Sequence, residues 1–248
     1  MPEWTWDTED FAALWYSEAH DRFPRPLKYL SRFATENDFA AHRSAVRARC
    51  SGDELERIGL ALHTLSTSEY RIEILGGRSD PATGLAEYRI VGARNHRYAL
   101  TLAQRCRGDD HGPVHCRLVR AESLPRALTS AIPAHPAGTR PTETFHPGDL
   151  EPAPGHHLQD NSHNSPRERY RRLLRRPSLG GGSAGLRIGP LYARPDATRT
   201  IQWYDIADDG RYTETRGRHI TVRPAGPNDL TTRFTAWLDD ADRRLQEV

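Results

Sequence analysis

The sequence predicts an α+β fold, in which a central antiparallel sheet is built by two pseudo-symmetric halves and flanked by helices. Apolar residues repeat at helical spacing in some segments and alternate, as in strands, in others. The links between consecutive predicted strands are short enough for hairpins, which makes their pairing antiparallel. The order helices, strands, helix occurs twice, so we expect one domain over 1–248 with halves of about 1–133 and 167–248.

The first half is predicted to open with an edge strand at 4–6 and three helices. Asp7 or Thr8 can cap the first helix, and Thr35 can cap the second, because their side-chain oxygens accept from free backbone N–H groups. The third helix, roughly 53–65, carries leucine and isoleucine at helical spacing.

Four strands and a helix should complete this half. The expected strands cover 70–75, 85–93, 96–106 and 114–121, and the helix covers 122–132. Gly76 and Gly77 are expected to end the first of these strands. The segment 76–84, rich in Gly, Asp and Pro, would then be an exposed loop.

A polar segment at 134–166 separates the halves. It is rich in Pro, His, Gly and Asn and poor in large apolar residues, so it cannot bury enough surface to offset its ordering entropy. We expect a mobile linker there and a flexible hinge in the glycine-rich run 180–185. The remaining expected elements are a helix at 167–176, strands at 186–192, 200–206, 211–215 and 220–223, and a last helix from about 227.

No motif for phosphate binding, dinucleotide binding, a nucleophile elbow or a zinc protease is present. Five of the twelve histidines fall in 134–166, where a polar loop is a better interpretation than a metal site, because metal ligation needs fixed geometry. The acidic pair Asp208 and Asp209 precedes Gly210 in a turn signal and is expected to be structural. We therefore predict that the protein is not an enzyme and has no catalytic, cofactor-binding or metal-binding residue.

Net charge and hydropathy indicate which kinds of partner, nucleic acid or membrane, the protein is expected to lack. The net charge of +2 gives no overall field toward nucleic acid. Six arginines lie within 167–176, and they could contact phosphates or an acidic partner, although a solvated helix face is the simpler interpretation. No window approaches the ~18 consecutive apolar residues of a membrane helix. The N-terminus has neither the basic nor the apolar region of a secretory signal, so we expect a cytoplasmic protein with no nucleic-acid partner and no membrane insertion.

Two stretches carry a resemblance to a known family. The first is Phe-Ala-Ala-Leu-Trp at 11–15 followed by Phe-Pro-Arg-Pro-Leu at 23–27. The second is Trp-Tyr-Asp-Ile-Ala-Asp-Asp-Gly-Arg-Tyr at 203–212 followed by Val-Arg-Pro at 222–224. In order and spacing they resemble the EspG family of ESX (type VII) secretion-associated proteins, over nearly the whole chain.

The resemblance implies a cytosolic chaperone that binds helical heterodimers of the PE–PPE type, keeps them soluble and delivers them to the ESX machinery. It also implies partner binding through the sheet and the C-terminal helical part. The partner-binding residues predicted on this basis are Gln202, Tyr204, Arg233, Arg78 and Asp80.

Two alternatives stay open: an enzyme with an unrecognised site, and an arginine-mediated nucleic-acid adaptor. A chaperone predicts a broad, partly apolar groove, whereas an enzyme predicts a deep pocket with converging polar groups. The adaptor predicts a continuous basic stripe that includes 167–176.

Overall fold

A computed structural model describes residues 2–18, 20–80, 82–151 and 165–247. The strands are β1 (Glu3–Trp6), β2 (Tyr70–Asp80), β3 (Gly84–Arg94), β4 (Tyr98–Arg107), β5 (Asp110–Arg120), β6 (Glu143–Phe145), β7 (Ser178–Ile188), β8 (Ala197–Ile206), β9 (Gly210–Arg216) and β10 (Ile220–Pro224). The helices are α1 (Thr8–Trp15), α2 (Glu36–Ala48), α3 (Gly52–Ser66), α4 (Leu124–Ala131), α5 (Pro147–Leu150), α6 (Pro166–Leu174) and α7 (Pro227–Gln246).

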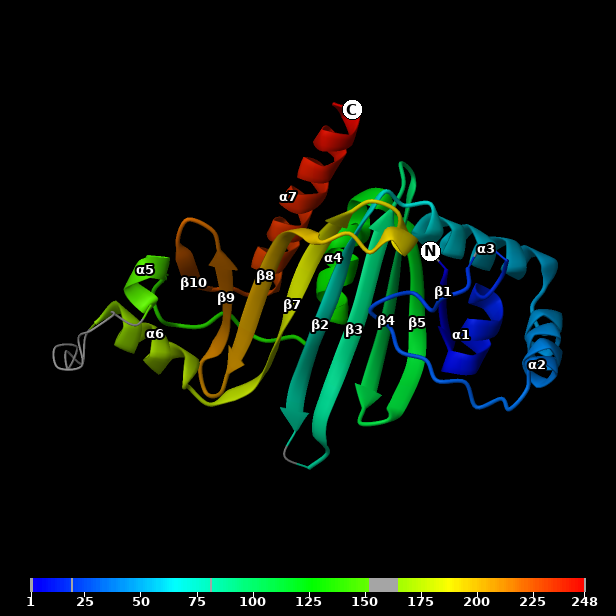
Figure 1. The fold of residues 1–248 in the computed structure, drawn as a ribbon, viewed down its shortest axis with the longest axis horizontal. Coiled ribbons are helices and arrows are strands. Elements are labelled where there is room, and N and C mark those ends of the chain that lie inside the picture. Colours follow the sequence, from blue (N-terminus) through cyan, green and yellow to red (C-terminus); the bar gives the residue numbers. More distant parts are fainter. Residues whose placement is uncertain (1, 19, 81, 152–164, 248) are drawn as a thin grey trace.

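The strands form one antiparallel sheet in the order β1-β5-β4-β3-β2-β7-β8-β9-β10-β6 (Figure 1). Four strands run outward on each side of the β2–β7 pair, and each set leads along the chain into one helix, α4 or α7. The predicted α+β class and antiparallel pairing are therefore confirmed. The bounds of the two halves stay a prediction.

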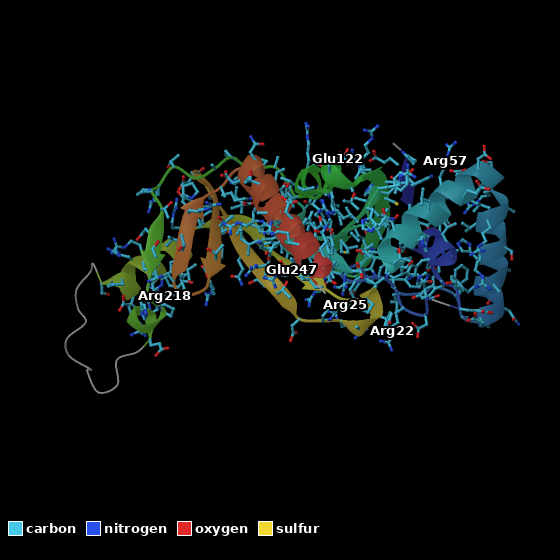
Figure 2. The ribbon with its side chains drawn as sticks, turned by 90° about the horizontal axis from the view of Figure 1, so that it is seen from above. Arg22, Arg25, Arg57, Glu122, Arg218 and Glu247 are labelled. Carbon is cyan, nitrogen blue, oxygen red and sulfur yellow. The ribbon has the colours of Figure 1, made fainter. Side chains whose placement is uncertain are left out.

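One face of the sheet is covered by α4 and α7, which lie behind the strands in Figure 1. Ile72, Ile74, Leu186 and Trp203 pack there against the apolar side of α7. Figure 2, seen from above, shows α7 over the middle strands, with Arg57 and Arg218 near the two ends of the sheet. This face holds the largest core of the molecule.

The other face is covered only at its ends. Helices α1 and α3 pack over β3, β4 and β5 at one end, where Phe11, Trp15 and Leu65 are buried. At the other end Tyr170 and Leu173 of α6 pack on β9 and β10. No helix of the described residues covers the middle strands β2 and β7 on this side (Figure 1).

Two glycine segments differ from the prediction. Strand β2 continues through Gly76 and Gly77 to Asp80, so no long loop exists at 76–84. The run 180–185 is no hinge, because it lies inside β7, the strand that joins the two halves. The glycines have a packing reason: a Cβ on Gly182 would lie 2.6 Å from both Trp203 Cζ2 and Tyr88 Oη.

The segment 134–166, predicted to be a mobile linker, contains strand β6 and helix α5 in its described part. Strand β6 pairs with β10 and buries Phe145, and Ala137 forms a bridge with Arg211. Polar contacts also hold this segment against the second half, which composition does not reveal: Asp209 Oδ1 accepts from the Thr139 backbone N–H at 2.7 Å. Residues 152–164, and the histidines at 156, 157 and 163, lie outside the described residues.

Candidate partner-binding face

The uncovered middle of the second face is the candidate functional site, and we call it the open face. Cross-strand pairing places its residues in rows, because partners in an antiparallel ladder project to the same side. One row runs from Arg89 through Leu75 and Ser183 to Gln202 and Glu214. The next row runs through Glu87, Gly77, Gly181 and Tyr204.

The floor of the open face, formed by Leu75, Leu85, Gly77 and Gly181, has exposed apolar side chains and glycines without side chains. Leu75 is 42% exposed and Leu85 is 58% exposed, which is unusual for leucines within strands. Leu85 lies against Gly77, with its Cδ1 3.0 Å from where a Cβ would be. Glycines within a strand often mark the close approach of another backbone. The floor therefore offers exposed apolar side chains beside a strip of bare backbone.

A charged wall borders the floor on the side of α3. Arg89 Nη2 contacts Glu87 Oε2 at 2.6 Å, and Lys28 Nζ lies 3.7 Å from the same carboxylate. Arg89 also donates to the Pro26 carbonyl at 3.0 Å. Hydrogen bonding from Arg89 lowers the pKa of the Glu87 carboxyl, although burial partly opposes it. This wall fixes the segment after α1 against β3.

The opposite wall is a hydrogen-bonded group centred on the buried Glu214. The hydroxyls of Tyr204 and Tyr170 donate to its Oε2 at 3.1 and 3.0 Å. Arg216 Nε donates to its Oε1 at 2.6 Å. Burial first, and then the negative charge of Glu214, raise the pKa of Tyr204. The group seats α6 on the sheet and keeps Tyr204 at the border of the open face.

An ion-pair chain closes one end of the floor. Glu73 accepts from Arg71 Nε at 2.7 Å and from Arg187 Nε at 2.8 Å. Arg71 is buried, while Arg187 is partly exposed. The open face therefore combines an apolar floor with a polar border, which is the usual anatomy of a reversible protein interface.

The Trp-Tyr-Asp…Asp-Gly-Arg-Tyr motif lies below and beside this face and supports it. Asp205 and Arg211 form a buried two-pronged ion pair, with distances of 2.6 and 2.8 Å. Asp209 contacts Arg176 and accepts from Tyr212 Oη at 2.7 Å. Burial alone would raise the pKa of Asp209, but these contacts hold it well below its usual range. The motif residues stabilise the fold and do not present a reactive group.

The residues predicted for partner binding are not all brought together. Gln202 and Tyr204 lie on the open face. Arg78 projects to the other face and donates to the Ala134 carbonyl at 3.4 Å. Arg233 lies on α7, also behind the sheet, and Asp80 accepts two backbone N–H bonds within its own turn. Sequence reasoning missed Leu75 and Leu85.

A cavity of about 820 Å³ lies at the end of α7 and brings ionisable side chains together. Arg94 Nε donates to Tyr70 Oη at 2.8 Å, and Asp242 contacts both residues. Burial raises the pKa of Tyr70 to about 12, so it stays protonated at neutral pH. These groups satisfy one another and tie α7 to β2 and β3.

Among the described residues no group of His, Cys, Asp and Glu could hold a metal ion.

The open face is a broad surface of the sheet that the helices of the described residues leave uncovered over β2 and β7. The EspG family model matches residues 7–236, nearly the whole chain. The chain belongs to the EspG family, whose members are secretion chaperones and not enzymes, which supports an ESX-associated secretion chaperone role. No curated protein matches the chain. None of the described helices has the length and apolar content that spanning a membrane requires.

Proposed function

We propose that this protein is a cytosolic chaperone that binds helical PE–PPE-type heterodimers on its open face, keeps them soluble and delivers them to the ESX machinery. The observation that supports the proposal is the second face of the sheet, which helices cover at its two ends but not over the middle strands β2 and β7. Leu75, which pairs with Ser183 of β7, and Leu85, which lies against Gly77 of β2, are exposed and would bury the apolar tip of a substrate helix.

The polar border suits a chaperone that must release its substrate. Charged pairs at the rim contribute mainly to specificity and association rate, and less to affinity. Arg187 and Arg89 are already paired with acids of the same chain, so a substrate gains little from them. Affinity would come from the floor, whose limited apolar area favours reversible binding.

Co-expression with a PE–PPE-type pair from the same genome, followed by size-exclusion chromatography, tests the proposal. The native chain should co-elute with the pair. The double variant Leu75→Glu, Leu85→Glu should lose co-elution, because it places two charges in the apolar floor.

A matched control is Leu60→Glu on α3, since Leu60 is also a partly exposed leucine but lies away from the open face. It should leave co-elution unchanged. Co-elution that survives the double variant would move the binding site elsewhere. Failure of the native chain with every such pair would reject the substrate class.

A further inference from the structure

The arginine-rich helix α6 borders a small cavity that the proposed function does not use. The cavity measures about 120 Å³ and lies between α6 and the segment that leads into β6. Its lining residues are Arg140, Pro141, Glu143, Arg169, Arg172, Leu173, Arg176 and Tyr212. Four arginines and a single carboxylate therefore meet around a space of molecular size.

Helix geometry explains why only some of the arginines of α6 reach the cavity. Ser165 caps the helix and Pro166 begins it. Arg169, Arg172 and Arg176 are three and four residues apart, so their side chains lie on one side of the helix. They share the side of α6 that faces 140–143. Arg171 and Arg175 lie on the opposite, exposed side.

Two of the guanidinium groups at the cavity, those of Arg169 and Arg176, each keep one buried nitrogen without a hydrogen-bond partner among the described residues. Arg169 Nε lies 3.6 Å from Glu143 Oε2, beyond hydrogen-bonding distance, and this buried nitrogen has no hydrogen-bond partner. Arg176 contacts Asp209 through Nη2, while its buried Nη1 has no hydrogen-bond partner. Within the described residues, the Arg140 side chain forms no ion pair. Buried N–H groups without acceptors are rare in native proteins, so these two nitrogens are donors that an acceptor at the cavity could satisfy.

We propose that this cavity binds a small, doubly charged oxyanion of the phosphate class. The planar donor fork of arginine matches the oxygens of phosphate, and several arginines together favour a dianion over a monoanion. The small space admits one such group and is far too small for a nucleic-acid duplex. On binding, the anion would accept from Arg140 and Arg169 and would draw Arg169 away from Glu143.

Isothermal titration of the full-length protein with inorganic phosphate, in a buffer free of other oxyanions, tests the site. We expect one saturable site. Arg140→Ala and Arg169→Ala should each weaken binding by about tenfold to a hundredfold, as expected for loss of a charged hydrogen bond. Glu143→Gln should strengthen it, because it removes the competing carboxylate. Arg176 is not substituted in this test, because its ion pair with Asp209 supports the fold.

Arg171→Ala and Arg175→Ala are matched controls on the same helix, and they should change phosphate affinity by less than about twofold, since exposed charges are screened. Equal losses in the control and cavity variants would overturn the proposal in favour of a diffuse basic field. So would the absence of saturable binding, or binding of acetate as tight as that of phosphate. Binding of adenosine monophosphate as well as phosphate assigns the site to phosphate esters, and binding of phosphate alone assigns it to the free ion. Secretion substrate is absent from the titration, so its outcome leaves the proposed function untouched.

Discussion

The two faces of the sheet use the same strands for opposite purposes. On β2, Ile72 and Ile74 are completely buried under helices, while Leu75, the next residue, is 42% exposed. On β8, Trp203 is buried and its neighbour Tyr204 is only half-buried. The covered face is a core that the chain completes for itself, and the open face is an apolar surface that the described chain leaves uncovered.

The difference shows that apolar content alone does not separate a core from a surface that stays exposed. Burial of apolar area stabilises the folded state where the chain supplies the second surface. Where no second surface exists, the same residues add little to folding and remain available to a partner. Mutations on the two faces should therefore separate stability from binding.

The largest expected effect comes from neighbours on β8. Trp203→Ala should lower the free energy of unfolding by about 3–5 kcal/mol, because it empties a filled core site. Tyr204→Ala should lower it by less, about 1.5–3 kcal/mol, the value of a hydrogen bond to a charged group, since the Tyr204 hydroxyl bonds to Glu214. Urea denaturation of both variants measures the difference. Equal losses would mean that the open face is as much a core as the covered one.

Gly182 and Gly77, which face opposite sides of the sheet, allow the two faces to be compared by smaller changes. Gly182→Ala should destabilise the protein by about 1–3 kcal/mol, because the new Cβ would overlap Trp203 and Tyr88 on the covered face. In Gly77→Ala the new Cβ would press only on the flexible end of Leu85 on the open face, so the loss of stability should be smaller. Thermal unfolding midpoints compare the two. A larger shift for Gly77→Ala would contradict the packing reason given for the glycines.

Acid should weaken the support of the open face. The pKa of Asp209 is lowered in the folded state, so its contribution is present above the unfolded value of about 3.9 and is lost as the pH falls below it. Unfolding measured between about pH 6 and pH 3 should show a loss of stability that is shallower in Asp209→Asn. Identical pH profiles for the two proteins would show that Asp209 does not carry this dependence.

The smallest expected effect on stability belongs to the floor of the open face. Each of the single changes Leu75→Glu and Leu85→Glu should alter the free energy of unfolding by about 0.5 kcal/mol or less, the range of ordinary surface substitutions. Chemical denaturation beside the co-elution assay checks this. A loss comparable to that of Trp203→Ala would make the binding result uninterpretable and would place these leucines in the core.

Helix starts and most strands could be predicted because their signals are local. The caps Asp7 and Thr35 have the predicted roles, accepting from the backbone N–H of Asp10 and Asp38. The glycine-rich strand β7 could not be recognised, because its glycines are selected by the rings of Tyr88 and Trp203, which come from two other strands. Leu75 could have been noticed, since it falls on the polar side of the alternation that includes Ile72 and Ile74.

By itself, the sequence determined the α+β class, the antiparallel hairpins, the family and the positions of most elements, because periodicity, capping and turn chemistry act over a few residues. Only the tertiary structure decided that β7 joins the halves, that β6 belongs to the sheet, and that one face stays uncovered between α3 and α6. These features depend on contacts between residues far apart in the chain, such as Asp209 with Thr139 and Tyr88 with Gly182. Nothing in the local pattern encodes which surfaces such contacts bring together or leave open.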